Sequence, residues 1–294
     1  MKKNIKNVFT GFITGLILLG GLSIISKIDI DKTSDNRKII NGLKLSILGD
    51  SISTFDGYSN DITSNTTLGS NVPRYGLKTS TLSSIDTTLS SVDETYWMKT
   101  INDLDMELCV SNTWRGTRVT TTGTTYPKNS SGCLTRSVNL HNDIKNEDPD
   151  IIVVYMGIND LDHEVTLGSF NELSEIYNNE TKEYTVDTNI FAPSYAMMIH
   201  KILTRYSNSD IYIMNHLPNH YGFVEATNVW NEQIKYISDY FNCNYVDIFN
   251  KTGINWDNYR TYLHDGLHPN KTGMELISNV LKESLLENYK FKEV

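Results

Sequence analysis

The chain has 294 residues, of which 39% are hydrophobic and 21% are charged, as in an ordinary globular protein. One core of moderate size that carries a long insertion accounts for this length as well as two small domains would. The net charge of −9, with no basic run after the first few residues, argues against a nucleic-acid partner.

The N-terminus has the pattern of a membrane-targeting signal. Lys2, Lys3 and Lys6 precede residues 8–25, an apolar stretch without a charged residue. This stretch is longer than a usual signal-peptide core and at the short limit of a membrane-spanning helix. Because the basic flank stays in the cytoplasm, we expect residues 1–27 to be a signal peptide or signal anchor, and to be the only membrane contact. The rest of the chain is then extracytoplasmic, either secreted or anchored to the cell membrane.

Residues 28–42 are polar and lack periodicity, which indicates a linker before a domain at 43–294. Within that domain, residues 52–92 are rich in Ser, Thr, Asp and Gly and show no sustained helical or alternating pattern. A structureless stretch of this length inside a domain is usually functional. We interpret it as an insertion that shapes the substrate site.

Five short apolar runs predict β-strands, at residues 43–48, 106–110, 150–156, 211–214 and 244–248. The third run is apolar at every position after Asp150, a pattern typical of strands that are covered on both faces, as in parallel sheets. Helical spacing predicts helices at about 94–104, 134–145, 193–206, 223–241 and 270–289. Strands that alternate with helices indicate an α/β fold, with a parallel sheet of about five strands and helices on both faces.

Polar sequences follow the first three strands. Gly49-Asp50-Ser51 ends the first strand, residues 111–116 follow the second, and residues 157–160 follow the third. In parallel sheets, chemistry gathers outside the carboxyl ends of the strands. A Gly-Asp-Ser turn is common in loops, but in this place we interpret Ser51 as a nucleophile.

A serine hydroxyl needs a base to remove its proton, and an imidazole is the usual one. His268 follows Asp265 by three residues in a turn, so Asp265 could hold one ring nitrogen while the other faces Ser51. Alone, this motif fits equally well a helix-entry loop with an exposed histidine. The other histidines show a weaker pattern. His141 and His200 lie in predicted helices, and His163, His216, His220 and His264 lie in loops without a carboxylate at useful spacing, except that His264 stands beside Asp265.

The tetrahedral intermediate of acyl transfer also needs donors that are aimed at its oxyanion. Asn159, at the end of the most apolar strand, offers a side-chain amide, and Gly116 offers a backbone N–H where the backbone can approach a ligand closely. The alternatives are that Asn159 is a turn residue with local hydrogen bonds and that Gly116 is a permissive loop glycine.

Together these four blocks resemble the SGNH, or GDSL-type, hydrolases, in which the same blocks occur in the same order. The matching blocks are Gly49-Asp50-Ser51-Ile52-Ser53, Trp114-Arg115-Gly116, Gly157-Ile158-Asn159-Asp160 and Asp265-Gly266-Leu267-His268-Pro269. The resemblance implies a flavodoxin-like three-layer α/β/α sandwich. It also implies Ser51 as the nucleophile, His268 as the base and Asp265 as the residue that orients it, with an oxyanion hole formed by Ser51, Gly116 and Asn159.

Neither a metal nor a cofactor is expected. Asp160, Asp162, His163 and Glu164 are packed into five residues, which we interpret as a solvated loop, and the family needs no ion. Zinc sites often show C-x-x-C spacing, which is absent among Cys109, Cys133 and Cys243. An exported chain could form one disulfide among these three cysteines and leave one thiol over, and the sequence does not decide which two would pair.

These observations predict an extracytoplasmic serine ester hydrolase that forms an acyl-enzyme. The outward location and the resemblance favour short acyl groups, above all acetyl, on a small ester or an acetylated polysaccharide. A lipase, lysophospholipase or thioesterase would need an extended apolar groove, and residues 52–92 look too polar to supply one. The alternatives from another class are an acyltransferase and a non-catalytic glycan-binding module.

Overall fold

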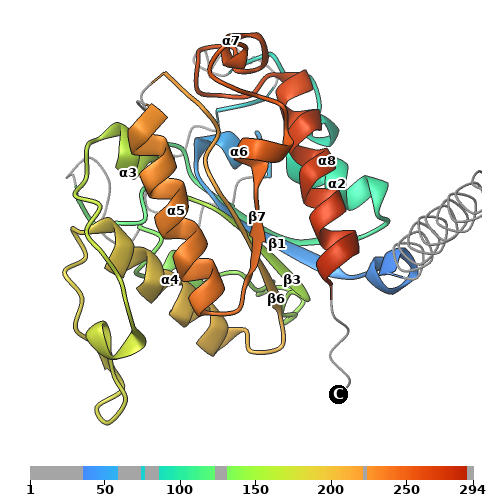
Figure 1. Ribbon diagram of the computed structural model, residues 1–294. Coiled ribbons are helices and arrows are strands. Elements are labelled where there is room, and N and C mark those ends of the chain that lie inside the picture. Colours follow the sequence, from blue (N-terminus) through green and yellow to red (C-terminus); the bar gives the residue numbers. More distant parts are fainter. Residues whose placement is uncertain (1–35, 59–73, 77–85, 123–130, 221–223, 290–294) are drawn as a thin grey trace, which may run out of the picture.

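The computed structural model describes residues 36–58, 74–76, 86–122, 131–220 and 224–289 (Figure 1). The expected membrane signal at 1–27, most of the expected linker and much of the insertion lie outside these ranges. Among the described residues, no helix is both long and apolar enough to cross a membrane.

A sheet of five parallel strands forms the centre of the molecule (Figure 1). Its strands are β1 (Lys44–Gly49), β2 (Glu107–Thr113), β3 (Ile151–Tyr155), β6 (Asp210–Met214) and β7 (Asn244–Val246). They are arranged in the order β2-β1-β3-β6-β7, and every neighbouring pair is parallel. All five residues of β3 are buried, as expected for a strand that is covered on both faces.

Helices cover both faces of this sheet (Figure 1). On one side α2 (Tyr96–Asp103) packs against α8 (Lys271–Asn288), and on the other α4 (Phe191–Arg205) packs against α5 (Val224–Tyr240). Helix α8 begins after Asn270, whose side chain accepts a hydrogen bond from the Gly273 N–H. The three-layer α/β/α sandwich expected from the sequence is therefore confirmed.

Shorter elements connect these layers. They are the helices α3 (Ile158–Asp162), α6 (Ile248–Lys251) and α7 (Tyr259–Tyr262), the hairpin strands β4 (Tyr177–Asn178) and β5 (Glu183–Tyr184), and the 3-10 turns η1 (Ser51–Ser53), η3 (Val92–Glu94), η5 (Arg136–Val138) and η6 (Leu173–Glu175). The sequence pattern predicted none of these as separate elements, because each is too short to show a period.

The prediction of a helix at 134–145 is wrong. After η5, this segment continues in turns and bends. The Asn142 side chain accepts hydrogen bonds from the backbone N–H groups of Ile144 and Lys145, both at 3.1 Å, which offers the chain an alternative to helical bonding. His141 therefore lies in a bend, where its ring nitrogens are 3.0 Å from the Tyr206 hydroxyl and 2.8 Å from the Asp143 carboxylate.

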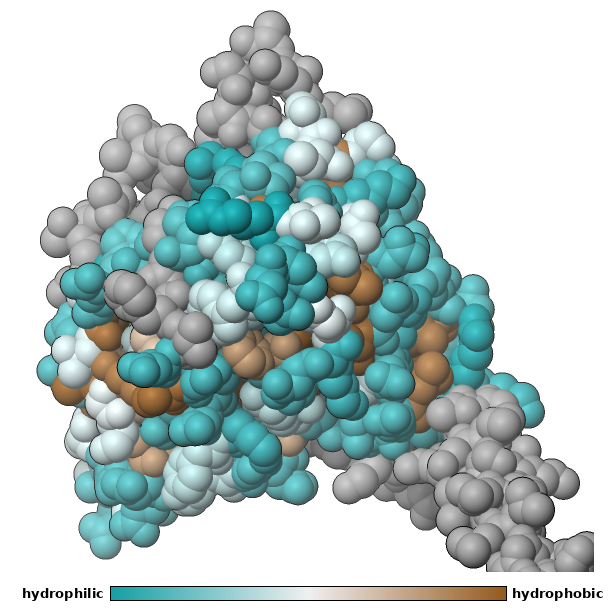
Figure 2. All heavy atoms as spheres, turned by 45° about the horizontal axis from the view of Figure 1, so that its top comes forward, coloured by the Kyte–Doolittle hydropathy of each residue, from teal (hydrophilic) through white to brown (hydrophobic). Residues whose placement is uncertain are grey.

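The strand order creates a crevice at the end of β1. This strand lies between β2 and β3, so the chain turns to opposite sides of β1 for its next two strands. In open α/β sheets such a reversal is where ligands bind, outside the carboxyl ends of the strands. In Figure 1 these ends point toward α6 and α7, and Figure 2 turns this end of the molecule forward and shows a mainly hydrophilic surface with hydrophobic patches.

Candidate active site

Ser51 opens the 3-10 turn η1 directly after β1. Asp50 caps this turn, because its carboxylate accepts a hydrogen bond from the Ile52 N–H at 3.0 Å. A Cβ atom on Gly49 would collide with the Ser53 side chain, so glycine lets the turn fold back against the strand end. Ser51 is buried and only 3% exposed. The sharp turn thus holds the serine at the carboxyl edge of the sheet.

Two hydrogen bonds connect this serine to the histidine and the acid near the C-terminus. Ser51 Oγ lies 2.9 Å from His268 Nε2, across 217 positions of sequence. His268 Nδ1 lies 2.8 Å from Asp265 Oδ2. The other carboxylate oxygen, Asp265 Oδ1, accepts from the backbone N–H groups of Leu267 at 3.0 Å and His268 at 2.8 Å. The structure thus brings together hydroxyl, imidazole and carboxylate in the order that activates a serine.

The electrostatics suit a neutral imidazole beside an ionised acid. Burial lowers the pKa of His268 below its usual value; Asp265 acts to raise it, and the nearby Arg74 and His264 lower it further. Burial acts to raise the pKa of Asp265, but hydrogen bonds from His268 and Leu267, together with the His268 charge, hold it well below its usual range. At neutral pH the imidazole can therefore accept the Ser51 proton.

The two expected oxyanion donors follow the strands on either side of β1. Asn159 lies in α3, and its side-chain amide donates to the Thr117 carbonyl at 2.9 Å. Gly116 is the third residue of the turn at 114–117, where its φ of +70° favours glycine. Because β2, β1 and β3 are neighbouring parallel strands, Gly116, Ser51 and Asn159 all lie just past the carboxyl ends of these strands, on one side of the sheet's strand ends. The Asn159 amide has a second N–H besides the one bound to Thr117.

The prediction that Asp160 lies in a solvated loop is wrong. It is fully buried in α3. Its carboxylate accepts hydrogen bonds from the backbone of Val119 at 2.8 Å and Thr120 at 3.0 Å, and from the Thr120 hydroxyl at 2.7 Å. Burial raises its pKa to about 6, although these bonds act to lower it. Asp160 thus ties the segment after Gly116 to the turn that holds Asn159.

Arg136 is a buried residue that the sequence did not single out. Its guanidinium donates to the carbonyls of Gly49 and Asn112, both at 2.6 Å, to Asn112 Oδ1 at 3.0 Å and to the Thr117 hydroxyl at 2.7 Å. Burial lowers its pKa to about 9, while the charge of Asp50 acts to raise it. Arg136 therefore links the ends of β1 and β2 to the turn of Gly116. The sequence pattern predicts a helix at 134–145 and therefore gives no sign that Arg136 donates these hydrogen bonds.

The other histidines lie outside the Ser51–His268–Asp265 group. His216 is buried after β6, its Nε2 lies 3.2 Å from the Met156 carbonyl, and burial lowers its pKa to about 4. His264 lies beside Asp265 in the sequence, but its Nε2 is 2.6 Å from Asp86 and 3.7 Å from Asp265. His200 lies in α4, as predicted, with Nδ1 2.8 Å from the Tyr184 hydroxyl.

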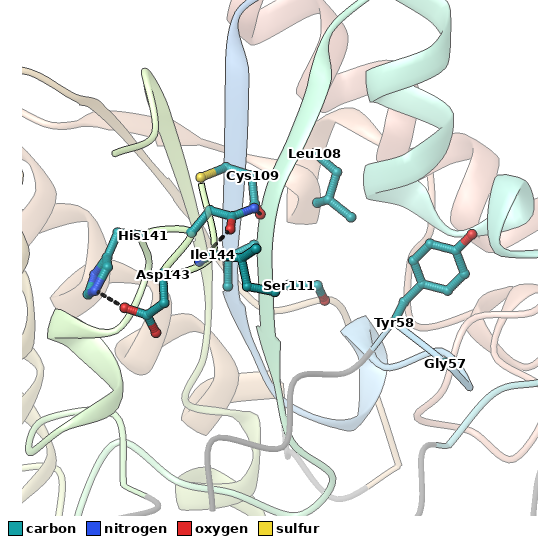
Figure 3. A pocket seen from close by; sticks show the side chains of 10 residues that line it. Gly57, Tyr58, Leu108, Cys109, Ser111, His141, Asp143 and Ile144 are labelled. Atoms are coloured by element: carbon teal, nitrogen blue, oxygen red, sulfur yellow. Dashed lines mark hydrogen bonds and ion pairs between the residues drawn. The ribbon is translucent and has the colours of Figure 1, made fainter. Parts of the chain in front are cut away.

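A separate cavity of about 300 Å³ opens beside the edge strand β2 (Figure 3). Its lining includes Tyr58, Cys109, His141 and Ile144, and none of Ser51, His268 and Asp265. It is therefore distinct from the candidate active site.

Cys109 and Cys133 are buried free thiols, so no disulfide joins any two of the three cysteines.

Comparisons with known proteins agree with this fold. The profile of the GDSL-like lipase/acylhydrolase family matches residues 43–285, whereas a comparison with curated proteins found no match. A Bacteroides ovatus protein classed as a GDSL-like lipase is 27% identical, with a TM-score of 0.61, over 84% of this chain and 100% of its own.

Two further solved structures share the fold at lower identity. A Bacteroides uniformis protein, also classed as a GDSL-like lipase, is 23% identical, with a TM-score of 0.57, over 83% of this chain and 95% of its own. A Lactobacillus plantarum protein is 16% identical, with a TM-score of 0.58, over 85% of this chain and 100% of its own. The family match, which spans the sheet and the site, shows that this chain belongs to the GDSL-like lipase/acylhydrolase family and is an ester-hydrolysing enzyme.

Proposed function

We propose that Ser51, His268 and Asp265 are the catalytic triad of a serine esterase that works through an acyl-enzyme. His268 Nε2 takes the Ser51 proton while Ser51 Oγ attacks the ester carbonyl, and then gives that proton to the departing alcohol. Water attacks the acyl-enzyme by the same route and frees the acid. The observation that supports this mechanism is the hydrogen-bonded chain from Ser51 through His268 to Asp265, at 2.9 and 2.8 Å.

The oxyanion of the tetrahedral intermediate is then held by the backbone N–H groups of Ser51 and Gly116 and by the Asn159 amide. Neutral donors that are fixed before the reaction stabilise such charge most effectively. The position of all three at one edge of the sheet, and the bond from Asn159 to Thr117, support this assignment.

The substrate that we propose is a short acyl group, acetyl above all, on carbohydrate, either a small ester or an acetylated polysaccharide. Polar groups beside the triad acid, namely Arg74, Asp86 and His264, favour a polar alcohol portion. A lipase, lysophospholipase or thioesterase would need an apolar groove for its acyl chain. The basic and apolar N-terminus at 1–27 supports an extracytoplasmic enzyme, secreted or membrane-anchored.

A fluorophosphonate probe tests the nucleophile without knowledge of the substrate. We expect one labelled peptide that contains Ser51, and Ser51→Ala should lose both the label and esterase activity, by about 10⁴-fold or more in kcat. Ser174→Ala, at an exposed serine in η6, is the matched control and should label as the wild type does. If Ser51→Ala kept its label and its activity, the assignment would be wrong.

A series of p-nitrophenyl esters tests the acyl group. We expect kcat/KM to be highest for acetate and to fall as the acyl chain lengthens, and we expect acetate release from an acetylated polysaccharide. A preference for acyl chains of about eight carbons or more would reject the deacetylase proposal and favour a lipase.

A further inference from the structure

The insertion at 52–92 meets the triad acid through Arg74. Arg74 Nη2 lies 2.7 Å from Asp265 Oδ2, the same oxygen that lies 2.8 Å from His268 Nδ1. The Arg74 side chain is 15% exposed and that of Asp265 is 35% exposed, so the pair is partly shielded from water. The acid of the proposed triad is therefore shared between its histidine and a guanidinium.

The chain around Arg74 is anchored to both halves of the site. Its backbone N–H donates to the Thr54 hydroxyl at 2.7 Å, and that hydroxyl donates to the Ser51 carbonyl at 2.9 Å. The next residue, Tyr75, is fully buried, and its hydroxyl donates to the Pro269 carbonyl at 2.8 Å. This short segment thus joins the turn of Ser51 to the turn that holds the acid and the base.

Asp86 and His264 fix the guanidinium from the other side. The Asp86 N–H donates to the Arg74 carbonyl at 2.7 Å, and Asp86 Oδ2 lies 3.6 Å from Arg74 Nη2. His264 Nδ1 lies 3.0 Å from the His268 carbonyl, to which it can only donate. The other ring nitrogen, Nε2, lies 2.7 Å from Arg74 Nη2 and 2.6 Å from Asp86 Oδ2. The guanidinium is therefore held between two carboxylates and an imidazole.

We propose that Arg74 is a positioning residue of the esterase reaction, which fixes the Asp265 carboxylate against His268 and favours the neutral, proton-accepting form of that imidazole. This inference rests on the proposed function of the triad. It gives the insertion a role in the chemistry itself, whereas the sequence indicated only a role in shaping the substrate site.

The charge balance at His268 gives this role a measurable consequence. In the part of the chain that the structure describes, the groups that face the imidazole are Asp265, Arg74, His264, the Tyr75 ring and the Ser51 hydroxyl. Asp265 favours the imidazolium, and the Arg74 cation on the same oxygen offsets part of that effect. Loss of Arg74 should therefore stabilise the imidazolium and move the acidic limb of the kcat/KM profile to higher pH.

The experiment compares pH profiles of kcat/KM for p-nitrophenyl acetate in the wild type, Arg74→Gln and Arg74→Lys. Because the ion pair is partly exposed, we expect Arg74→Gln to raise the midpoint of the acidic limb by about 0.5–1 pH unit. At pH values well below the midpoint, this shift lowers kcat/KM by about 3–10-fold relative to the wild type, and the difference shrinks as the pH rises. Arg74→Lys keeps the charge and should keep the wild-type midpoint, with a lower kcat because an ammonium lacks the planar fork.

Arg205→Gln is the matched control. Arg205 forms an exposed ion pair with Asp148, at 2.9 Å, near the amino ends of the strands. This variant loses an arginine–aspartate pair far from the triad and should keep the wild-type midpoint. A midpoint that moves equally in Arg205→Gln and Arg74→Gln would show an effect of net charge alone and would overturn the inference.

Two other outcomes would also overturn it: an Arg74→Gln profile with the wild-type midpoint, or an Arg74→Lys midpoint that moves as far as that of Arg74→Gln. If Arg74→Gln fails to fold, as judged by circular dichroism, Arg74→Lys decides, since its midpoint must stay within about 0.3 pH unit of the wild type. Failure of the proposed function is distinguishable, because then Ser51→Ala would remain active whatever Arg74 does.

Discussion

The side-chain amide of Asn159 donates a hydrogen bond to the carbonyl of Thr117, with 2.9 Å between nitrogen and oxygen. This bond joins the helix that follows β3 to the turn that follows β2, and Gly116 directly precedes Thr117. Asn159 is only 7% exposed, so its amide is held in place before any substrate arrives. The two proposed oxyanion donors beyond Ser51 are thus parts of one connected unit.

Asn159→Ala should lower kcat for p-nitrophenyl acetate by about 10²–10³-fold and leave KM within a few-fold, because the lost donor acts mainly on the oxyanion. Asn159→Asp should be at least as impaired, since a carboxylate would bring a negative charge beside the oxyanion. Asn178→Ala, at an exposed position of the β4–β5 hairpin, is the control and should keep wild-type kinetics. A wild-type kcat in Asn159→Ala would contradict the oxyanion role.

Asp265→Asn should lower kcat by about 10²–10⁴-fold. The amide can donate to His268 Nδ1 and so favours the ring form whose Nε2 carries the proton and no longer accepts from Ser51. The rate of fluorophosphonate labelling at Ser51, measured beside kcat, should fall in parallel. A variant that labels at the wild-type rate would show that Asp265 does not orient the base.

The wild-type activity should rise with pH along an acidic limb whose midpoint lies below 6.5, the ordinary pKa of histidine. Burial disfavours the imidazolium of His268, and only the neutral ring accepts the serine proton, so activity is lost as the pH falls through the lowered pKa. The profile of kcat/KM in the free enzyme reports this midpoint. A midpoint above 6.5 would mean that Asp265 outweighs burial and Arg74.

The elements that the sequence predicted are those with a local signal. The strand at 150–156 is apolar throughout, and the structure has β3 there, while Ser51 and His268 stood out because each lies in a motif beside a predicted strand or helix. Such patterns report burial and turns, which depend on neighbouring residues.

The residues that the sequence missed act through distant contacts. Arg74 reaches Asp265 across 191 positions, and nothing near Arg74 shows that an acid lies opposite. Asp160 directly follows Asn159, and its sequence neighbours give no sign that it is buried. Only the fold shows that its carboxylate accepts hydrogen bonds from the backbone N–H groups of Val119 and Thr120. The helix expected at 134–145 failed because Asn142 bonds its own backbone instead.

Asp50 should make stability depend on pH. Burial raises its pKa from 3.8 to about 7, so between these values the folded state holds a proton that the unfolded state has lost, and stability falls as the pH rises. Asn at this position keeps an acceptor for the Ile52 N–H but cannot ionise. Relative to the wild type, Asp50→Asn should therefore gain about 3 kcal/mol in the free energy of unfolding between pH 4 and 7.

The difference between the two proteins isolates Asp50. Asp160, whose pKa is also raised, destabilises in the same pH range, whereas His216, whose pKa is lowered to about 4, acts in the opposite direction. Both are present in the wild type and in the variant, so the contribution of His216 cancels and that of Asp160, whose charge acts on Asp50, cancels in part. Urea unfolding at several pH values gives the comparison, and two parallel stability curves would show that Asp50 is ionised in the folded protein.

Arg136 should matter for both stability and catalysis, because it is the donor that holds the ends of β1 and β2 together. Arg136→Met has a similar length but leaves the carbonyls of Gly49 and Asn112 without this donor in a buried site. We expect a loss of about 3 kcal/mol in the free energy of unfolding. Arg136→Lys keeps the charge and fewer of the bonds, so its loss should be intermediate.

The effect of Arg136→Met on activity follows from the same bonds. The Gly49 carbonyl lies just before the Ser51 turn, and the Thr117 hydroxyl lies just after Gly116, so loosening both should lower kcat more than it changes KM. Urea unfolding and initial rates, measured below the denaturation range, separate the two effects. Arg205→Met, at the exposed pair with Asp148, should change neither. If Arg136→Met were as stable and as active as the wild type, the strand ends would have to be held by their own hydrogen bonds alone.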